Sequence, residues 1–214
     1  PGRLVRPCRF KPVSDFTDRR LVGLKSGGRG AHKKILWPIS PEWAMIITMI
    51  PIVSIVGTSN SGKTTLIEKL VAELTRRGFR VATIKHSHHG FEIDHEGKDS
   101  WRHKQAGAVA TVLASPGRIA LIEDAAKDYD LVEIRDLYIR NADIILAEGY
   151  KRNPHPKIEV YRTDLMRERL CGPGDNLIAV AADKPVSPEV PWFEWNDAAG
   201  LSDLIVERYL SDKR

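Results

Sequence analysis

One eight-residue segment, GTSNSGKT at residues 57–64, constrains this chain more than any other. It matches the pattern GxxxxGK[ST], follows an apolar run typical of a strand at residues 52–56, and precedes a helical pattern at residues 63–77. A glycine-rich turn between a strand and a helix directs backbone N–H groups and the positive end of the helix dipole toward one point. The segment therefore predicts a phosphate-binding loop, and a glycine turn without a ligand is the alternative.

The side chains of this loop predict which part of a nucleoside triphosphate each would contact. Lys63 can reach the β and γ phosphates as a point charge, while Thr64 places a hydroxyl on a Mg²⁺ ion shared with them. Gly57 and Gly62 supply the dihedral angles that the turn requires. The full set of expected nucleotide contacts in the loop is Gly57, Thr58, Ser59, Asn60, Ser61, Gly62, Lys63, Thr64 and Thr65.

Strand and helix patterns alternate along residues 49–214 and predict one α/β domain there. They favour a mostly parallel sheet with helices on both faces, the three-layer arrangement of P-loop nucleoside triphosphatases. Beyond the first strand, the expected strands are residues 80–85, 110–115, 118–123, 142–147, 157–161 and 177–182. The expected helices are residues 63–77, 101–106, 131–139 and 198–210. Ser100 is the expected N-cap of the second helix.

Positive charge is concentrated in the first 48 residues. They hold 10 of the 33 Lys and Arg residues but only 3 of the 28 Asp and Glu residues, so the rest of the chain is slightly acidic. Nucleic acid is therefore not an expected partner, although the net charge of the chain is +5. Residues 1–48 also lack a sustained helical or strand period, and we expect them to be a disordered basic leader outside the functional domain.

The apolar stretch at residues 44–56 bears on where the protein works. It is too short to span a bilayer, and cleavage after it as a signal peptide would remove the strand that the phosphate loop needs. The two cysteines, Cys8 and Cys171, indicate neither a disulfide framework nor a cysteine metal site. We expect a cytoplasmic protein that has no membrane partner.

A second functional carboxylate is expected at the end of another strand, because phosphate-loop proteins need one near the Mg²⁺ ion and the attacking water. The segment ADIILAEGY at residues 142–150 supplies Glu148 directly after a buried run, at the sheet edge where ligands bind in open α/β folds. Glu148 is thus a candidate metal ligand and, with Lys63, a candidate catalytic residue. An exposed acid at the end of a strand is the alternative.

The segment KHSHHGFEIDHEGKDS, residues 85–100, is the other unusual stretch. Because it follows the second strand, Lys85 and His86 should face the nucleotide edge. Asp94 could be a second carboxylate beside the magnesium, and Lys98 could pair with a phosphate or another anion. Its imidazoles could instead hold zinc or nickel, or belong to a polar solvated surface; they are His86, His88, His89 and His95.

One residue bears on the choice of base. The guanine-reading pattern NKxD does not occur, but Asp183 follows the expected strand at residues 177–182, where such a carboxylate would lie. Asp183 therefore favours GTP over ATP, although an Asp after a strand is also common in turns.

Several segments together resemble the molybdopterin-guanine dinucleotide biosynthesis protein B family. They are GTSNSGKTT, KHSHH followed by GKDS, AEGYK, HKQAGA, VLASP and AVAADKP, and they extend from about Met49 to the C-terminus without the leader. The resemblance implies a homodimer that binds GTP and Mg²⁺, hydrolyses GTP slowly at most, and assists a molybdenum cofactor guanylyltransferase that attaches GMP to molybdopterin. A groove for the nucleotide or for the anionic cofactor would be lined by Lys85, His86, Asp94 and Lys98.

Two alternatives stay open at this point. A more distant similarity to dethiobiotin-synthetase-like enzymes covers the phosphate loop, the lysine that ends the second strand, and the Glu-Gly pair after a buried strand. It would make the protein a small-molecule kinase or ligase, with Asp94 and Glu148 beside the magnesium. A metal-delivery GTPase would instead use His86, His88 and His89.

Overall fold

The structure is a computed structural model, and it describes residues 49–87, 90–172, 174–186 and 188–213. The predicted leader at residues 1–48 and the histidines His88 and His89 lie outside the described residues. The strands are β1 (Ile52–Val56), β2 (Val81–Lys85), β3 (Ala110–Ser115), β4 (Arg118–Glu123), β5 (Ile144–Glu148), β6 (Lys157–Tyr161), β7 (Leu177–Ala182) and β8 (Trp192–Glu194). The helices are α1 (Lys63–Arg76), α2 (Asp99–Gln105), α3 (Leu131–Tyr138) and α4 (Ala198–Tyr209), with short 3₁₀ turns at Thr163–Leu165 and Ser211–Lys213.

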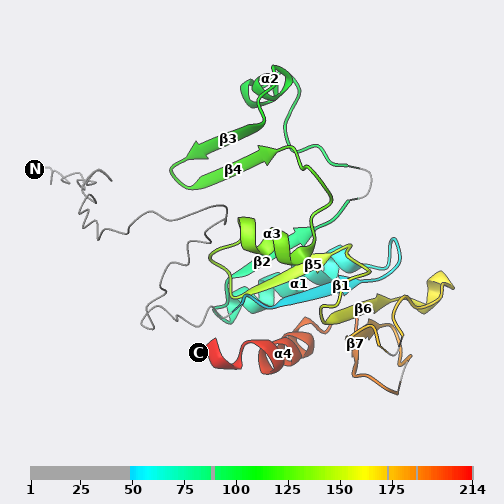
Figure 1. Cartoon of the computed structure of the whole chain (residues 1–214). Helices are drawn as coiled ribbons and strands as arrows, with labels where there is room; N and C mark the ends of the chain where they lie inside the picture. Colours follow the sequence, from blue (N-terminus) through cyan, green and yellow to red (C-terminus); the bar gives the residue numbers. More distant parts are fainter. Residues whose placement is uncertain (1–48, 88–89, 173, 187, 214) are drawn as a thin grey trace, which may run out of the picture. The chain divides into compact units, whose positions relative to one another are not determined.

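Six strands form one sheet in the order β2-β5-β1-β6-β7-β8, and every neighbouring pair in it is parallel (Figure 1). Glu148 at the end of β5 is in register with Ile55 of β1 and with Lys85 of β2. The carboxyl ends of these three strands therefore meet at one edge of the sheet. The predicted α/β fold is confirmed. Within the part of the chain that the structure describes, antiparallel pairing is found only between β3 and β4, which form a separate hairpin.

The central strands are buried on both faces, as near-continuous apolar runs predict for a parallel sheet. Side chains of β1 alternate between the faces: Val53 and Ile55 pack with α1 and α4, whereas Ile52 packs with Leu131 of α3. Figure 1 shows α3 and α4 on opposite sides of the sheet. The prediction of helices on both faces is therefore confirmed.

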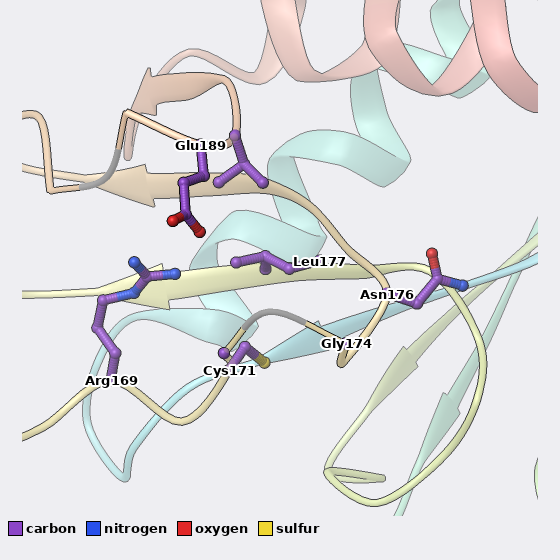
Figure 2. A pocket seen from close by; sticks show the side chains of 8 residues that line it. Arg169, Cys171, Gly174, Asn176, Leu177 and Glu189 are labelled. Atoms are coloured by element: carbon purple, nitrogen blue, oxygen red, sulfur yellow. The ribbon is translucent and has the colours of Figure 1, made fainter.

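The segment between β6 and β7 carries a cavity of about 450 Å³ (Figure 2). Its lining includes Arg169, Cys171 and Asn176 from this segment and Glu189 from the segment that leads to β8. Burial is the largest cause that raises the pKa of the Cys171 thiol to about 11, with Glu159 adding to it. The thiol is therefore protonated near neutral pH, so this cavity does not present a reactive nucleophile.

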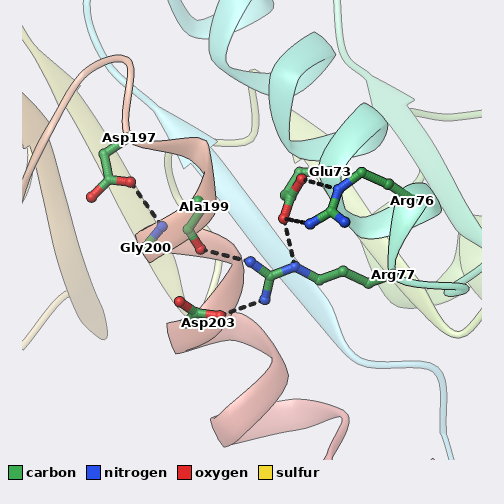
Figure 3. Close-up of polar contacts among 7 residues, drawn as sticks. All are labelled: Glu73, Arg76, Arg77, Asp197, Ala199, Gly200 and Asp203. Atoms are coloured by element: carbon green, nitrogen blue, oxygen red, sulfur yellow. Dashed lines mark hydrogen bonds and ion pairs between the residues drawn. The ribbon is translucent and has the colours of Figure 1, made fainter.

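An ionic cluster joins α1 to α4 (Figure 3). The guanidinium group of Arg77 donates to Glu73 at 2.8 Å, to Asp203 at 2.5 Å, and to the carbonyl oxygen of Ala199 at 3.1 Å. Hydrogen bonds from Arg76, and then from Arg77, lower the pKa of Glu73 to about 2. Because α1 begins directly after the phosphate loop, this cluster fixes the helix that supports the loop.

Capping side chains start α3 and α4. Asp130 accepts from the backbone N–H of Glu133 at 2.8 Å, and the Glu133 carboxylate accepts in return from the N–H of Asp130 at 3.1 Å. Asp197 accepts from the N–H of Gly200 at 2.8 Å. Both helix starts follow from the local sequence.

Two sequence-based expectations need correction. Ser100 is not the N-cap of α2, because Lys98 occupies that position and the Ser100 hydroxyl donates to Asp94 at 3.0 Å. β5 begins at Ile144 rather than at residue 142, since the Asp143 carboxylate instead accepts from the backbone and guanidinium group of Arg80. The structure also adds β8, which the sequence pattern does not indicate because the strand has only three residues and follows a proline-rich stretch. No helix in the described part of the chain is long and apolar enough to cross a bilayer.

Candidate functional site

The phosphate loop joins β1 to α1 with glycine at both of its ends. Gly57 has a φ of 153° and Gly62 a φ of 99°, both in the region that favours glycine. A Cβ atom on Gly57 would overlap the carbonyl oxygen of Val160 and lie 2.6 Å from the Ser61 hydroxyl. Only glycine at position 57 therefore allows the loop to pack this closely against β6.

Two polar groups of the loop fit an anionic ligand. The Lys63 ammonium folds back and donates to the carbonyl oxygen of Thr58 at 2.7 Å, which holds its charge at the loop. The Ser61 hydroxyl is buried and has no hydrogen-bond partner among the described residues. Because a buried hydroxyl without a partner is costly, an oxygen atom of a bound ligand is a suitable acceptor for it.

A hydroxyl and a carboxylate meet beside the loop. Thr64 Oγ1 lies 3.0 Å from Glu148 Oε1 and 3.2 Å from Oε2. Lys85 Nζ lies 3.8 Å from the same carboxylate, as the register of β2 and β5 requires. Hydroxyl and carboxylate oxygens are ligands that Mg²⁺ prefers, together with phosphate oxygens and water. Thr64 and Glu148 therefore fit the residues that would hold Mg²⁺ on a triphosphate.

The electrostatic surroundings of Lys63 also fit a phosphate ligand. Burial is the largest cause that lowers the pKa of Lys63, the Glu148 carboxylate opposes it, and the ammonium groups of Lys151 and Lys85 lower it further. The Lys63 ammonium therefore interacts with two other ammonium groups and one carboxylate. A polyanion at this position would relieve their mutual repulsion and favour the charged form of Lys63.

A pocket of about 200 Å³ adjoins the loop on the β6 side. The guanidinium carbon of Arg162 lies 4.5 Å from the centroid of the Trp195 ring, and both side chains line this pocket. An aromatic ring with a guanidinium group over it is a surface on which a nucleotide base could stack. The other described lining residues are Ser61, Gly62, Thr65, Leu66, Val160 and Asn196.

Asp183, the carboxylate predicted to contact the guanine base, accepts hydrogen bonds from Thr163. Asp183 accepts from the backbone N–H of Thr163 at 3.0 Å and from the Thr163 hydroxyl, and these hydrogen bonds, the hydroxyl first, lower the pKa of Asp183. Asp183 is not among the described residues that line the Arg162–Trp195 pocket. Guanine recognition by Asp183 therefore stays a prediction.

One further arginine contacts the loop. Arg167, in the segment between β6 and β7, donates from Nη1 to the carbonyl oxygen of Ser59 at 3.0 Å. No motif in the sequence marks Arg167, Arg162 or Trp195. Arg162 and Arg167 reach the loop because β6 lies beside β1 in the sheet, and Trp195 joins them because it follows β8, which is in the same sheet beyond β7.

The structure does not join the second half of the 85–100 segment to Thr64 and Glu148. Asp94 accepts from the Ser100 hydroxyl and from the N–H of His95, each at 3.0 Å, and its other oxygen is buried without a partner among the described residues. Lys98 stands at the start of α2. A metal role for Asp94 and a phosphate role for Lys98 therefore stay predictions.

A transition-metal site also stays untested. Among the described residues, no three His, Cys, Asp or Glu side chains gather in a way that could hold a metal ion. His86 lies 3.0 Å from Asp128 through Nε2, while His88 and His89 lie outside the described residues.

Comparison with known proteins identifies the family. The sequence profile of molybdopterin guanine dinucleotide synthesis protein B, MobB, matches residues 52–183, which is more than half of the chain. The chain belongs to the MobB family. The matched range contains the phosphate loop, Glu148 and Asp183, so every predicted site residue lies within the MobB segment.

Individual MobB relatives are similar over most of their length. A molybdopterin-guanine dinucleotide biosynthesis adapter protein from Haemophilus influenzae is 40% identical over 157 residues, which cover 73% of this chain and 88% of the relative. The protein of the same name from Escherichia coli is 37% identical over 171 residues, covering 75% of this chain and 94% of the relative. The crystal structure of Bacillus subtilis MobB has a TM-score of 0.61 at 31% identity, covering 75% of this chain and 98% of that structure.

Proposed function

We propose that this protein is a GTP-binding accessory protein in the synthesis of molybdopterin guanine dinucleotide. It binds Mg·GTP and assists a guanylyltransferase that attaches GMP to molybdopterin, in the cytoplasm. The observation that carries the proposal is the contact of 3.0 Å between Thr64 and Glu148 beside the phosphate loop of a MobB-family chain. The loop amides and Lys63 would hold the phosphates, and Thr64 and Glu148 would hold the Mg²⁺ ion that neutralises their charge.

Hydrolysis is expected to be slow. An arginine that stabilises the transferring phosphoryl group accelerates such reactions strongly, but Arg167 here donates to the loop carbonyl of Ser59. The expected role is therefore nucleotide-dependent binding of the partner enzyme rather than rapid turnover.

Calorimetric titration tests the nucleotide specificity. With Mg²⁺ present, GTP should bind more tightly than ATP, and steady-state turnover of either should stay below roughly 1 s⁻¹, the lower end for kinases. The titration is repeated with the purified guanylyltransferase, where tighter GTP binding is expected if the two proteins assemble. Turnover of ATP above that rate with a metabolite acceptor would favour the kinase or ligase alternative, and no heat from either nucleotide would rule out the proposal.

A homodimer is part of the proposal, and the β3–β4 hairpin supports it. Val112 lies opposite Leu121, and Ile119 lies two residues from Leu121 on the same face of the hairpin. These three side chains are 62%, 43% and 74% exposed, whereas on the other face Thr111 is buried and Leu113 is 43% exposed. An exposed apolar face of this kind marks an interaction surface, and we infer that a second copy of the chain covers it.

Replacing Ile119 by aspartate should convert the dimer to a monomer. A charge in the centre of an apolar contact would be buried without a partner, which strongly opposes association. Sedimentation velocity of the variant and the wild type measures this. Leu137→Asp is the matched control, because Leu137 is a 50% exposed leucine on α3, outside the hairpin. A dimeric Ile119→Asp protein, or a monomeric wild type, would contradict the assignment of this surface.

A further inference from the structure

A further pocket is formed in part by the residues that follow Glu148 of the candidate nucleotide site. Its volume is about 380 Å³, and it is lined by His86 from the end of β2, Asp128 from the segment before α3, and Gly149, Tyr150, Lys151 and Arg152 from the segment after β5. Since Gly149 follows Glu148 in the chain, the pocket begins one residue from the proposed Mg²⁺ ligand.

The backbone that forms this pocket is held in place. Gly149 has a φ of 102°, and a Cβ atom there would lie 2.9 Å from the carbonyl oxygen of His86, so the two segments touch closely. The Asn153 side chain donates to the Ser54 hydroxyl on β1 at 3.1 Å and to the carbonyl oxygen of Tyr150. These hydrogen bonds connect the wall of the pocket to β1, the strand directly before the phosphate loop.

The lining combines aromatic surface with positive charge. The rings of His86 and Tyr150 have centroids 4.7 Å apart, and the Tyr150 hydroxyl donates to a backbone carbonyl group at 3.3 Å, which fixes the ring. Lys151 and Arg152 are exposed cations at the pocket. The Asp128 carboxylate contacts His86 at 3.0 Å and retains acceptor positions for other donors. A flat heterocycle that carries N–H donors and a phosphate group would match all three features.

The pocket also lies close to the phosphate loop. Gly149 of its lining directly follows Glu148, and the Glu148 carboxylate lies 3.0 Å from the Thr64 hydroxyl of the loop. Two phosphate-bearing ligands could therefore lie side by side at one edge of the sheet.

We propose that this pocket binds a phosphate-bearing pterin next to Mg·GTP. The aromatic pair and Asp128 would contact the pterin ring, and Lys151 and Arg152 would contact its phosphate. The inference rests on the proposed function, because it assigns to the protein a direct contact with the acceptor of GMP. It makes the protein a carrier that presents both substrates to the transferase.

Fluorescence titration with a pterin probe tests the proposal. The probe is 6-hydroxymethylpterin monophosphate, the comparison ligand is 6-hydroxymethylpterin without phosphate, and each is added with and without a non-hydrolysable Mg·GTP analogue. The phosphorylated probe should bind about tenfold more tightly than the unphosphorylated one. The double variant Lys151→Ala, Arg152→Ala should lose about this factor for the phosphorylated probe alone. Arg208→Ala, which removes an exposed cation on α4, is the control and should match the wild type.

The outcomes separate this inference from the proposed function. Failure of the wild type to bind the phosphorylated probe, equal affinity for the two pterins, an unaffected double variant, or displacement of the probe by the Mg·GTP analogue would each overturn it. Such results together with normal GTP binding leave the proposed function intact. Binding of the probe by a protein that shows no heat with GTP would instead support the pocket and contradict the proposed function.

Discussion

Replacing Lys63 by alanine is expected to weaken Mg·GTP binding by about 10- to 100-fold, or about 1.5 to 3 kcal/mol, the usual contribution of a charge-assisted hydrogen bond. The Lys63 ammonium lies at the loop, where it donates to the Thr58 carbonyl oxygen at 2.7 Å, and no other side chain in the loop carries a positive charge. Calorimetric titration at constant Mg²⁺ measures the loss. Unchanged affinity would contradict the phosphate-binding role of the loop.

A matched control removes the same charge from the same helix. Arg76 stands in the last turn of α1 and donates to Glu73 of the same helix, whereas Arg77 makes the contacts to α4, so Arg76→Ala should leave GTP affinity near that of the wild type.

The pH dependence of GTP binding is a second test of the role of Lys63. Burial lowers the pKa of Lys63 in the free protein, and a bound triphosphate would raise it, so binding takes up protons at alkaline pH. GTP affinity should therefore fall as pH rises through the pKa of the free protein, and this fall should be absent in Lys63→Ala.

Much of the fold could be predicted because its signals are local. The apolar runs of β1, β5 and β7 each bury most of their residues. The spacing GxxxxGK[ST] determines the turn between β1 and α1 independently of the rest of the chain. The place of Glu148 also followed from local sequence, since a buried parallel strand delivers its last residue to the ligand edge. These features depend on short stretches of chain.

The remainder of the site depends on strand order, which local patterns do not encode. Arg162 and Trp195 are separated by more than thirty residues, and they meet only because β6, β7 and β8 are neighbours. Arg167 reaches Ser59 only because the segment after β6 folds back over the sheet edge. The segment KHSHH and GKDS looked like one continuous site, but its two halves have different partners: His86 contacts Asp128, whereas Asp94 contacts Ser100.

The sequence of β6 indicates an exposure that the structure does not have. KIEVY alternates charged and apolar residues, a pattern typical of a half-exposed strand. Ile158 and Val160 do pack under α1 and α4, but Lys157 and Glu159 are also buried, at 2% and 1% exposure. The Lys157 ammonium donates to backbone carbonyl oxygens, among them that of Asp175 at 2.8 Å. The charged face of β6 is therefore covered by the segment between β6 and β7, and the carbonyl groups of Asn153 and His155 before β6 add acceptors for Lys157.

Removing the contact between Arg169 and the buried Glu159 carboxylate is expected to reduce the stability of the fold strongly. The Glu159 carboxylate accepts from Arg169 Nε at 3.1 Å and from the backbone N–H of Leu170. Arg169→Leu would leave the buried carboxylate without its counter-charge, and breaking a buried pair in this way costs about 3 kcal/mol of the free energy of unfolding. Denaturant unfolding followed by tryptophan fluorescence measures this loss. Arg76→Leu, which removes an arginine side chain that is 71% exposed, should change the midpoint little.

A second substitution separates loss of charge pairing from loss of packing. Glu159→Gln keeps an oxygen that can accept from Leu170 but removes the charge, so Arg169→Leu combined with Glu159→Gln should be more stable than Arg169→Leu alone. A double variant no more stable than the single one would assign the cost to packing instead.

The same substitutions should also affect GTP binding, because Arg167 lies in the same segment and donates to Ser59. Arg169→Leu alone should weaken GTP binding, and the double variant should restore it in parallel with stability. The buried charges of β6 would then act on the nucleotide site by holding in place the segment that contacts it.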